Sequence, residues 1–440
     1  MGAIGIIGLL LGISALIILS YRGINAFVAS LVATGIVIVS NAMPFWESYT
    51  TYYATGMRNF AGSFFLLFGL AAAFGEFMKI SGSAESVAGK LFQIAGAKWA
   101  PVACLLITLF MAMGGISAFV IVFAVYPVAA PLFRKANITK ETMPAIFLCA
   151  SVTLTLSLPG NPTSTNALLT MTELGTNAYA APRMGIIAGA VGLVIASILV
   201  TWMTKRETAR GNGYVISGTD STNQNEDTDK NLPLFWSSIL PLVIVMVTMF
   251  ILRDRLPTVH AILTSLMVAI FFVFVLNFKT MKGKITQTFA TGYWSSITPL
   301  MLTAGVMGFA AVVQNAPGFQ YFINFAMSLA DAFNPYVSGA IAVNIVAGIT
   351  GTALGGLQIF ADTMLPAYLA LNINPEAFHR ILVIASSGLD TLPHCATFIT
   401  MCAVCGVSVK NSYKHVFVVA VITPIILTIL CIALAMVGII

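Results

Sequence analysis

Two short stretches decide the fold of this chain: SLPGNPTSTN at residues 157–166 and SSGLDTLPH at residues 386–394. Each lies inside a long apolar segment, 142–172 in the first case and 381–407 in the second. Proline and glycine interrupt helices, and an interrupted helix at membrane depth leaves backbone N–H and C=O groups without partners. Such backbone persists only where protein, water or a ligand satisfies it. The two stretches therefore predict broken helices at a binding site.

The composition around these breaks is that of a membrane protein. Of the 440 residues, 58% are hydrophobic and only 8% are charged, whereas a soluble chain carries about 25% charged residues. Apolar runs long enough to cross a bilayer recur from end to end. The net charge of +6 does not indicate nucleic acid, because the basic residues lie in short loops, where they set orientation. We predict an all-α polytopic protein in the lipid bilayer, with no nucleic-acid partner.

The apolar segments fall into three groups. Two stretches, 99–133 and 335–371, carry small residues in the middle, and we interpret each as a re-entrant hairpin. Segments 83–96 and 318–332 mix apolar and polar residues at helical spacing, which predicts helices in the membrane interface. The uninterrupted spans are predicted at 3–20, 24–43, 60–79, 183–203, 234–252, 258–277, 293–313 and 416–439.

Basic residues give the orientation of these spans. With the topology above, all 21 Lys and Arg fall on one side except Arg58, Arg183, Arg253, Arg255 and Arg380. The positive-inside bias makes the richer side cytoplasmic, which puts both termini outside. The first apolar run has no basic n-region and no cleavage site, so it is expected to be a retained helix. The polar stretch 205–233 is predicted to be a cytoplasmic linker between two halves.

The two halves resemble each other at a shift of about 235 residues. The matching pairs include Gly82 and Gly318, Asn137-Ile138 and Asn372-Ile373, and Ser157-Leu158-Pro159 and Thr391-Leu392-Pro393. The first copy starts with a helix running inward and the second with one running outward. We therefore predict two inverted repeats, 1–204 and 234–440, each with five transmembrane helices and one re-entrant hairpin. Inverted repeats with interrupted helices at matching positions are typical of secondary transporters.

The two hairpin tips and the two breaks form the predicted substrate site. Helix N-termini that open after such breaks present free N–H groups and the positive end of a dipole, which suits a carboxylate. No Arg or Lys lies within the four stretches. The alternative is that their hydroxyls and amides only satisfy the broken backbone. The candidate substrate-binding residues are Gly114, Gly115, Ser117, Asn161, Thr163, Ser164, Thr165, Asn166, Thr350, Gly351, Thr352, Gly355, Gly356 and Thr391.

Ionisable residues at membrane depth are the candidates for proton coupling. Desolvation favours the neutral form of a buried carboxylate, so such a group can take up and release a proton. Asp390 is the leading candidate, with His394 as its partner or replacement, and Asp362 follows the second hairpin tip. The alternative role for Asp390 is to cap a half-helix. The other histidines, expected to contact water or lipid headgroups at span ends, are His260, His379 and His415.

The remaining patterns narrow the function. The chain has no H-E-x-x-H, no G-x-S-x-G and no P-loop sequence, so we expect no catalytic residues. Its six cysteines lie in or beside apolar segments and are interpreted as packing residues. We expect no metal site and no cofactor beyond a coupling ion, which is H⁺, with Na⁺ as the alternative. A cation/proton antiporter and a membrane-embedded enzyme are the two rival functions.

Several of these stretches resemble one protein family. FGEFMK at 74–79 with SGSAE at 81–85 is similar to the GKLM…SGGAE stretch of the gluconate permease (GntP) family. SSGLDTLPH at 386–394, followed by Ser412-Tyr413-Lys414, resembles the hydroxybutyrate-permease-like branch of that family. The likeness covers most of the chain except the linker.

The family belongs to the ion transporter superfamily, and the resemblance carries its properties as expectations. It implies a homodimer in the bacterial inner membrane, with a scaffold domain and a transport domain in each protomer. It also implies an elevator-type motion and proton-coupled symport of a gluconate- or hydroxybutyrate-like monocarboxylate, with a sodium-coupled carboxylate transporter as the alternative. Both breaks depart from the gluconate permeases: LPGNP at 158–162 replaces a His- and Pro-rich run, and Asp390 precedes Thr391-Leu392-Pro393 in place of Asn-Asp-Pro.

Overall fold

The computed structural model describes residues 2–161, 163–170, 172, 174–216, 232–252, 255–328, 333–371 and 373–440. Within these ranges every regular element is a helix. Nine helices there are long and apolar enough to cross a membrane, or up to ten if one bent pair counts as a single span. The prediction of an all-α polytopic membrane protein is confirmed. The centre of the predicted linker, 217–231, and Arg253 lie outside the described residues.

The helix bounds follow the predicted segments closely. The longer helices are α1 (Gly2–Tyr21), α2 (Ala26–Ser40), α4 (Ala54–Ile80), α5 (Ser83–Met113), α6 (Ala118–Ala136), α10 (Pro182–Ala209), α11 (Phe235–Leu252), α12 (Thr258–Leu276), α14 (Ile285–Asn315), α15 (Pro317–Ser328), α16 (Pro335–Thr350) and α22 (Ile422–Met436). The shorter helices are α3 (Phe45–Glu47), α7 (Met143–Leu148), α8 (Thr155–Ser157), α9 (Ser164–Thr170), α13 (Phe278–Met281), α17 (Ala353–Thr363), α18 (Leu365–Leu369), α19 (Pro375–Ala385), α20 (Ala396–Cys405) and α21 (Val409–Val416). Single π-helical turns occur at Ser48–Tyr53, Cys149–Leu154 and Phe417–Val421, and 3-10 turns at Lys140–Thr142 and Leu389–Thr391.

Both helix breaks occur where proline and glycine predict them. The first helix ends at Ser157, and the chain leaves helical geometry until α9 begins at Ser164. In the second half α19 ends at Ala385, and the segments on either side of the break are bent by 56°. We call residues 157–166, which include the first residues of α9, the first break, and the segment between Ala385 and Ala396 the second break.

The hairpin turns also lie at the predicted glycines. The chain reverses between α5 and α6 at Gly115, whose φ is 95°, and between α16 and α17 at Gly351, whose φ is 68°. Only glycine adopts such backbone routinely. The segment predicted at 83–96 forms the first part of α5 and ends at a non-helical Gly96, while the segment predicted at 318–332 begins as the separate helix α15.

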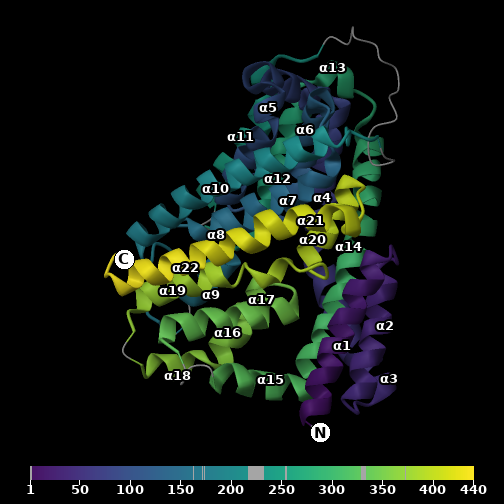
Figure 1. Cartoon of the computed structure of the whole chain (residues 1–440). Helices are drawn as coiled ribbons and strands as arrows, with labels where there is room; N and C mark the ends of the chain where they lie inside the picture. Colours follow the sequence, from purple (N-terminus) through teal and green to yellow (C-terminus); the bar gives the residue numbers. More distant parts are fainter. Residues whose placement is uncertain are drawn as a thin grey trace.

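The long helices α4 and α14, one from each half, pack against each other along their length. Gly56 of α4 lies against Gly308 of α14, and Gly292 of α14 lies against Ala73 of α4. The two helices are therefore antiparallel, and glycine at these crossings lets their backbones approach closely. Figure 1 shows that α14 then continues beside α1 and α2. This antiparallel course is what inverted repeats require, and the inversion itself stays a prediction.

Two further contacts join the halves, and we call them the corner contacts. The side chain of Asn41, which follows α2, accepts a hydrogen bond of 2.9 Å from the amide of Gly318 at the α14–α15 corner. The side chain of Asn277, which follows α12, donates one of 3.4 Å to Ser83 Oγ at the α4–α5 corner. Each half thus closes the corner of the other. Because α4 and α14 are antiparallel, the two corners lie at opposite ends of this helix pair.

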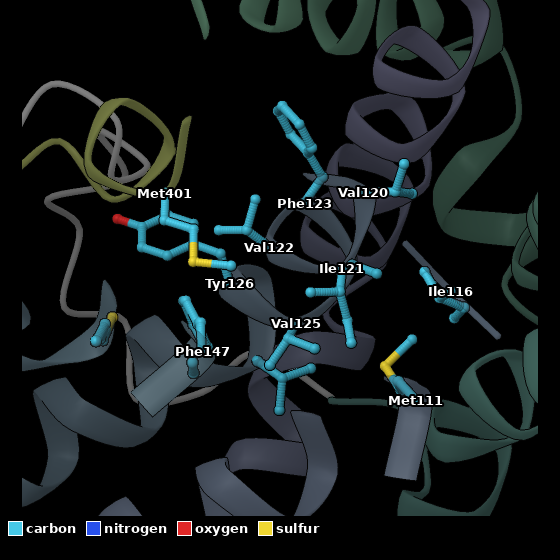
Figure 2. Packing of buried hydrophobic residues seen from close by; sticks show 14 of the residues in the cluster. Met111, Ile116, Val120, Ile121, Val122, Phe123, Val125, Tyr126, Phe147 and Met401 are labelled. Atoms are coloured by element: carbon cyan, nitrogen blue, oxygen red, sulfur yellow. The ribbon is translucent and has the colours of Figure 1, made fainter. Parts of the chain in front are cut away.

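Buried side chains form two large apolar clusters. One is centred on α6, and Figure 2 shows its residues Val120 to Tyr126 together with Phe147 of α7 and Met401 of α20. The other joins α1 and α2 to α16, α17 and α19. All six cysteines are buried, and none of them forms a disulfide bond, as predicted. The clusters hold the hairpins and broken helices in the interior of each half.

The end of α10 is tied to α21 through one buried carboxylate. Glu207, 1% exposed, accepts hydrogen bonds from Asn212 Nδ2 at 2.6 Å, Arg210 Nη1 at 3.1 Å and Lys414 Nζ at 3.1 Å. Figure 1 shows α10 and α22 running side by side. His415, 5% exposed, lies 3.9 Å from the same carboxylate, so its expected contact with water or headgroups is wrong.

Candidate functional site

The tip of the second hairpin lies directly against the second break. A Cβ atom added to Gly351 would lie 3.1 Å from Cδ2 of His394, so the tip can approach the imidazole only because it has no side chain. About two helical turns earlier, Asn344 of α16 accepts a hydrogen bond of 2.9 Å from the amide of Leu389 in the break. The structure therefore brings together Gly351 and His394, which the sequence placed in one site.

Asp390 and His394 are the buried ionisable side chains of the second break. Asp390 is 4% exposed and His394 1% exposed. Asp390 Oδ1 and both ring nitrogens of His394 make no hydrogen bond of good geometry, although the imidazole lies close to the backbone of Gly348 and Ile349, and no nitrogen of His394 lies within 4.0 Å of the carboxylate. Asp390 lies next to the amide of Ala353, the first residue of α17. Buried polar atoms are nearly always satisfied, so three open atoms beside a helix N-terminus indicate a place that a proton, a water molecule or a ligand completes.

The hydroxyl groups around this tip already bind backbone. Thr350 Oγ1 donates to Val346 O at 3.0 Å, and Thr352 Oγ1 accepts from the amide of Gly355 at 2.9 Å and so caps α17. Gly356 lies against the backbone of Ala347, so it serves the close packing of α16 and α17. The alternative to substrate binding, that these side chains satisfy the backbone of the hairpin, explains the hydrogen bonds that they make in this conformation.

Thr391 has a similar backbone role in the second break. Its hydroxyl donates a hydrogen bond of 3.1 Å to Ala420 O, which lies in the π-helical turn of the last span. A π-helical turn leaves carbonyl groups without the usual partner, and a hydroxyl from the break supplies one. Thr391 therefore fixes the break to the last span.

The first break is held by its own amides and hydroxyls. Asn161 Nδ2 donates to Leu158 O at 2.8 Å, Thr163 Oγ1 bonds Asn161 Oδ1 at 2.6 Å, and Asn166 Nδ2 donates to Asn161 O at 2.9 Å. Thr165, 7% exposed, makes no side-chain hydrogen bond to any described residue, which leaves its hydroxyl open to a ligand. The predicted residues of this break thus lie together, and the side chain of Ser164 lies outside the described residues.

Two residues that the sequence analysis placed at a span end reach into the first break. His379 of α19 is 0% exposed and bonds Asn166 Oδ1 at 2.9 Å and Thr176 Oγ1 at 2.7 Å through its two ring nitrogens. Arg380, also 0% exposed, donates to Leu158 O at 3.1 Å. The expectation that His379 contacts water or headgroups is wrong, because helix α19 begins with Pro375 and places both side chains inside.

Asp362 and the first hairpin tip are not part of this assembly in the structure. Asp362 lies near the far end of α17, is exposed, and accepts a hydrogen bond of 2.8 Å from Gln358 Nε2. Gly114 lies against Met246 of α11, and Ser117, beyond the turn at Gly115, begins α6 without a side-chain cap. By contrast α17 packs against α9, so the second hairpin contacts both breaks.

Comparison with known proteins gives matches along nearly the whole chain. The model of the GntP family permeases matches residues 4–437. The uncharacterized transporter YxjC of Bacillus subtilis (strain 168) is 28% identical over 458 residues, which covers 94% of this chain and 95% of that protein. A solved structure, of the Alcanivorax borkumensis YdaH transporter, is 15% identical with a TM-score of 0.35, over 86% of this chain and 87% of that one.

Proposed function

Because the chain belongs to the GntP permease family, as its sequence predicts, it is a membrane transporter, and we propose that it is a secondary active carrier for a small organic acid anion and protons. The substrate class is a gluconate- or hydroxybutyrate-like monocarboxylate. Asp390 takes up the coupling proton, and His394 assists it. The carboxylate binds between the second hairpin tip, the second break and the first break.

One observation carries this proposal: three polar atoms of Asp390 and His394 are buried and unpartnered beside the hairpin tip. A transporter has to load and release its ligand, so its site contains groups that the protein alone leaves unsatisfied. The N-terminus of α17, whose first amide lies next to Asp390, adds the positive end of a helix dipole for a carboxylate. The open hydroxyl of Thr165 adds a donor from the first break.

Alternating access follows from the way the two halves are built. We infer that 1–204 and 234–440 are inverted repeats joined by the linker 205–233, and that they expose the site to the two sides in turn. The antiparallel pairing of α4 with α14 and the corner contacts support this inference. We further propose that the protein is a homodimer and that each protomer transports its substrate by an elevator-type motion.

Uptake into proteoliposomes tests the function directly. With the outside acidified, purified protein should accumulate labelled 3-hydroxybutyrate or gluconate, and a protonophore should stop accumulation. The protein is first reconstituted without sodium and then with an inward sodium gradient at equal pH. Accumulation driven only by the sodium gradient would mean that sodium, and not the proton, is the coupling ion. Absence of uptake and of exchange for both acids would overturn the substrate class.

Asp390→Asn tests the coupling residue. The variant should lose accumulation driven by the pH gradient but keep exchange of labelled for unlabelled acid, because exchange needs no net proton movement. Asp362→Asn is the matched control, since it removes a carboxylate from the exposed end of α17. It should accumulate acid like the unmodified protein. The reverse pattern, with coupling lost only in Asp362→Asn, would move the proton site to α17.

A further inference from the structure

Arg380 is the largest fully buried side chain in the described part of the chain. It lies in α19 of the second half, but its guanidinium binds carbonyl groups in and near the first break. Nε and Nη2 donate to Ala180 O at 3.2 and 2.8 Å, and Nη1 donates to Leu158 O at 3.1 Å and Leu156 O at 3.4 Å. These four hydrogen bonds join the end of the helix before the first break to the loop that precedes α10. A guanidinium has five N–H groups, so its donors are almost completely used.

Among the described residues, the charge of Arg380 has no counter-ion within ion-pair distance. No described carboxylate oxygen lies within 4.0 Å of its nitrogen atoms. Glu376, one helical turn earlier on α19, is exposed and accepts a hydrogen bond of 3.2 Å from the amide of Ala181 instead. Carbonyl dipoles solvate the guanidinium but cannot cancel its charge. Buried charges are normally paired, so an unpaired one beside a candidate site indicates that an anion visits the site.

We propose that the substrate carboxylate is this counter-ion, and that Arg380 is the specificity-determining residue that makes the carrier prefer anions to neutral molecules. The inference rests on the proposed function. Arg380 is a positioning residue: it fixes the carbonyl groups of the first break and acts on the substrate through its field. A charge acts over several ångströms in a protein interior, because screening there is weaker than in water.

The experiment compares an acid with its neutral amide. Isothermal titration calorimetry on the purified full chain measures binding of 3-hydroxybutyrate against 3-hydroxybutyramide, and of gluconate against gluconamide. The unmodified protein should bind the acid more tightly by on the order of tenfold. Arg380→Met should abolish that preference. Arg183→Met, which removes an exposed arginine at the start of α10, is the matched control and should retain it.

Arg380→Lys keeps the inference testable if the methionine variant does not fold. Lysine retains the charge but not the planar fork, so it should bind both ligands more weakly while keeping the preference for the acid. A lost preference in Arg380→Lys, or a full preference in Arg380→Met, would overturn the role of the charge. If the unmodified protein binds neither acid, the proposed substrate class fails first. If it binds the acids and Arg380→Met discriminates equally well, only this inference fails.

Discussion

The second hairpin tip lies so close to the second break that the residue at position 351 has to be small. Gly351 has a φ of 68°, and a Cβ atom added to it would lie 3.1 Å from Cδ2 of His394. We expect Gly351→Ala to lower uptake several-fold, because the added methyl group must displace the imidazole from the second break. The strained backbone also costs about 1 kcal/mol of stability. Uptake in proteoliposomes and thermal unfolding measure the two effects separately.

The variant Gly23→Ala is a control that introduces the same backbone strain without displacing a neighbouring side chain. Gly23 has a φ of 83°, and a Cβ atom there would meet nothing within 4 Å. This variant should therefore lose about the same stability as Gly351→Ala but keep normal uptake. Equal losses of uptake in the two variants would show that the tip does not act through His394.

At the scale of elements, the joint between α10 and α21 depends on Glu207. Its side chain is 2% exposed, while the Arg210 and Lys414 side chains that bind it are 49% and 46% exposed. Glu207→Gln should cost about 2 kcal/mol, because it removes a buried carboxylate from charged hydrogen bonds. Glu76→Gln, at the 3.3 Å pair with Lys79, should cost less than about 1 kcal/mol. Thermal unfolding of both variants in detergent compares them, and equal shifts would contradict the structural role of Glu207.

Local sequence signals predicted the elements but not the contacts between them. Proline and glycine act within a few residues, so the breaks and the turns at Gly115 and Gly351 could be read from the chain. Arg380 and Asn344 belong to regular helices, and Arg380 reaches carbonyl groups more than 200 residues away in sequence. The available signal was a polar residue inside or next to an apolar helix. The positive-inside rule placed Arg380 at a span end on the outer side instead, because it counts charges without their depth.

For the whole molecule, the corner contacts make a symmetric prediction. Asn41→Ala and Asn277→Ala should each remove about 1 kcal/mol of stability, since each variant loses one side-chain bond between the halves. The corners lie at opposite ends of the α4–α14 pair, so the two variants should favour opposite orientations of the site. Labelling of Thr163→Cys by an impermeant thiol reagent, applied to either side of oriented vesicles, measures the orientation. A shift to the same side in both variants would contradict inverted repeats.

The burial of all six cysteines gives the chain a practical property. All of them are buried, so a thiol reagent in water meets no accessible sulfur on the folded protein. The unmodified chain can therefore serve as the background control in site-directed labelling experiments. Spectroscopic probes can be attached at single introduced cysteines, and distances between them followed during transport. No packing residue has to be replaced first, so the motions observed would be those of the native interior.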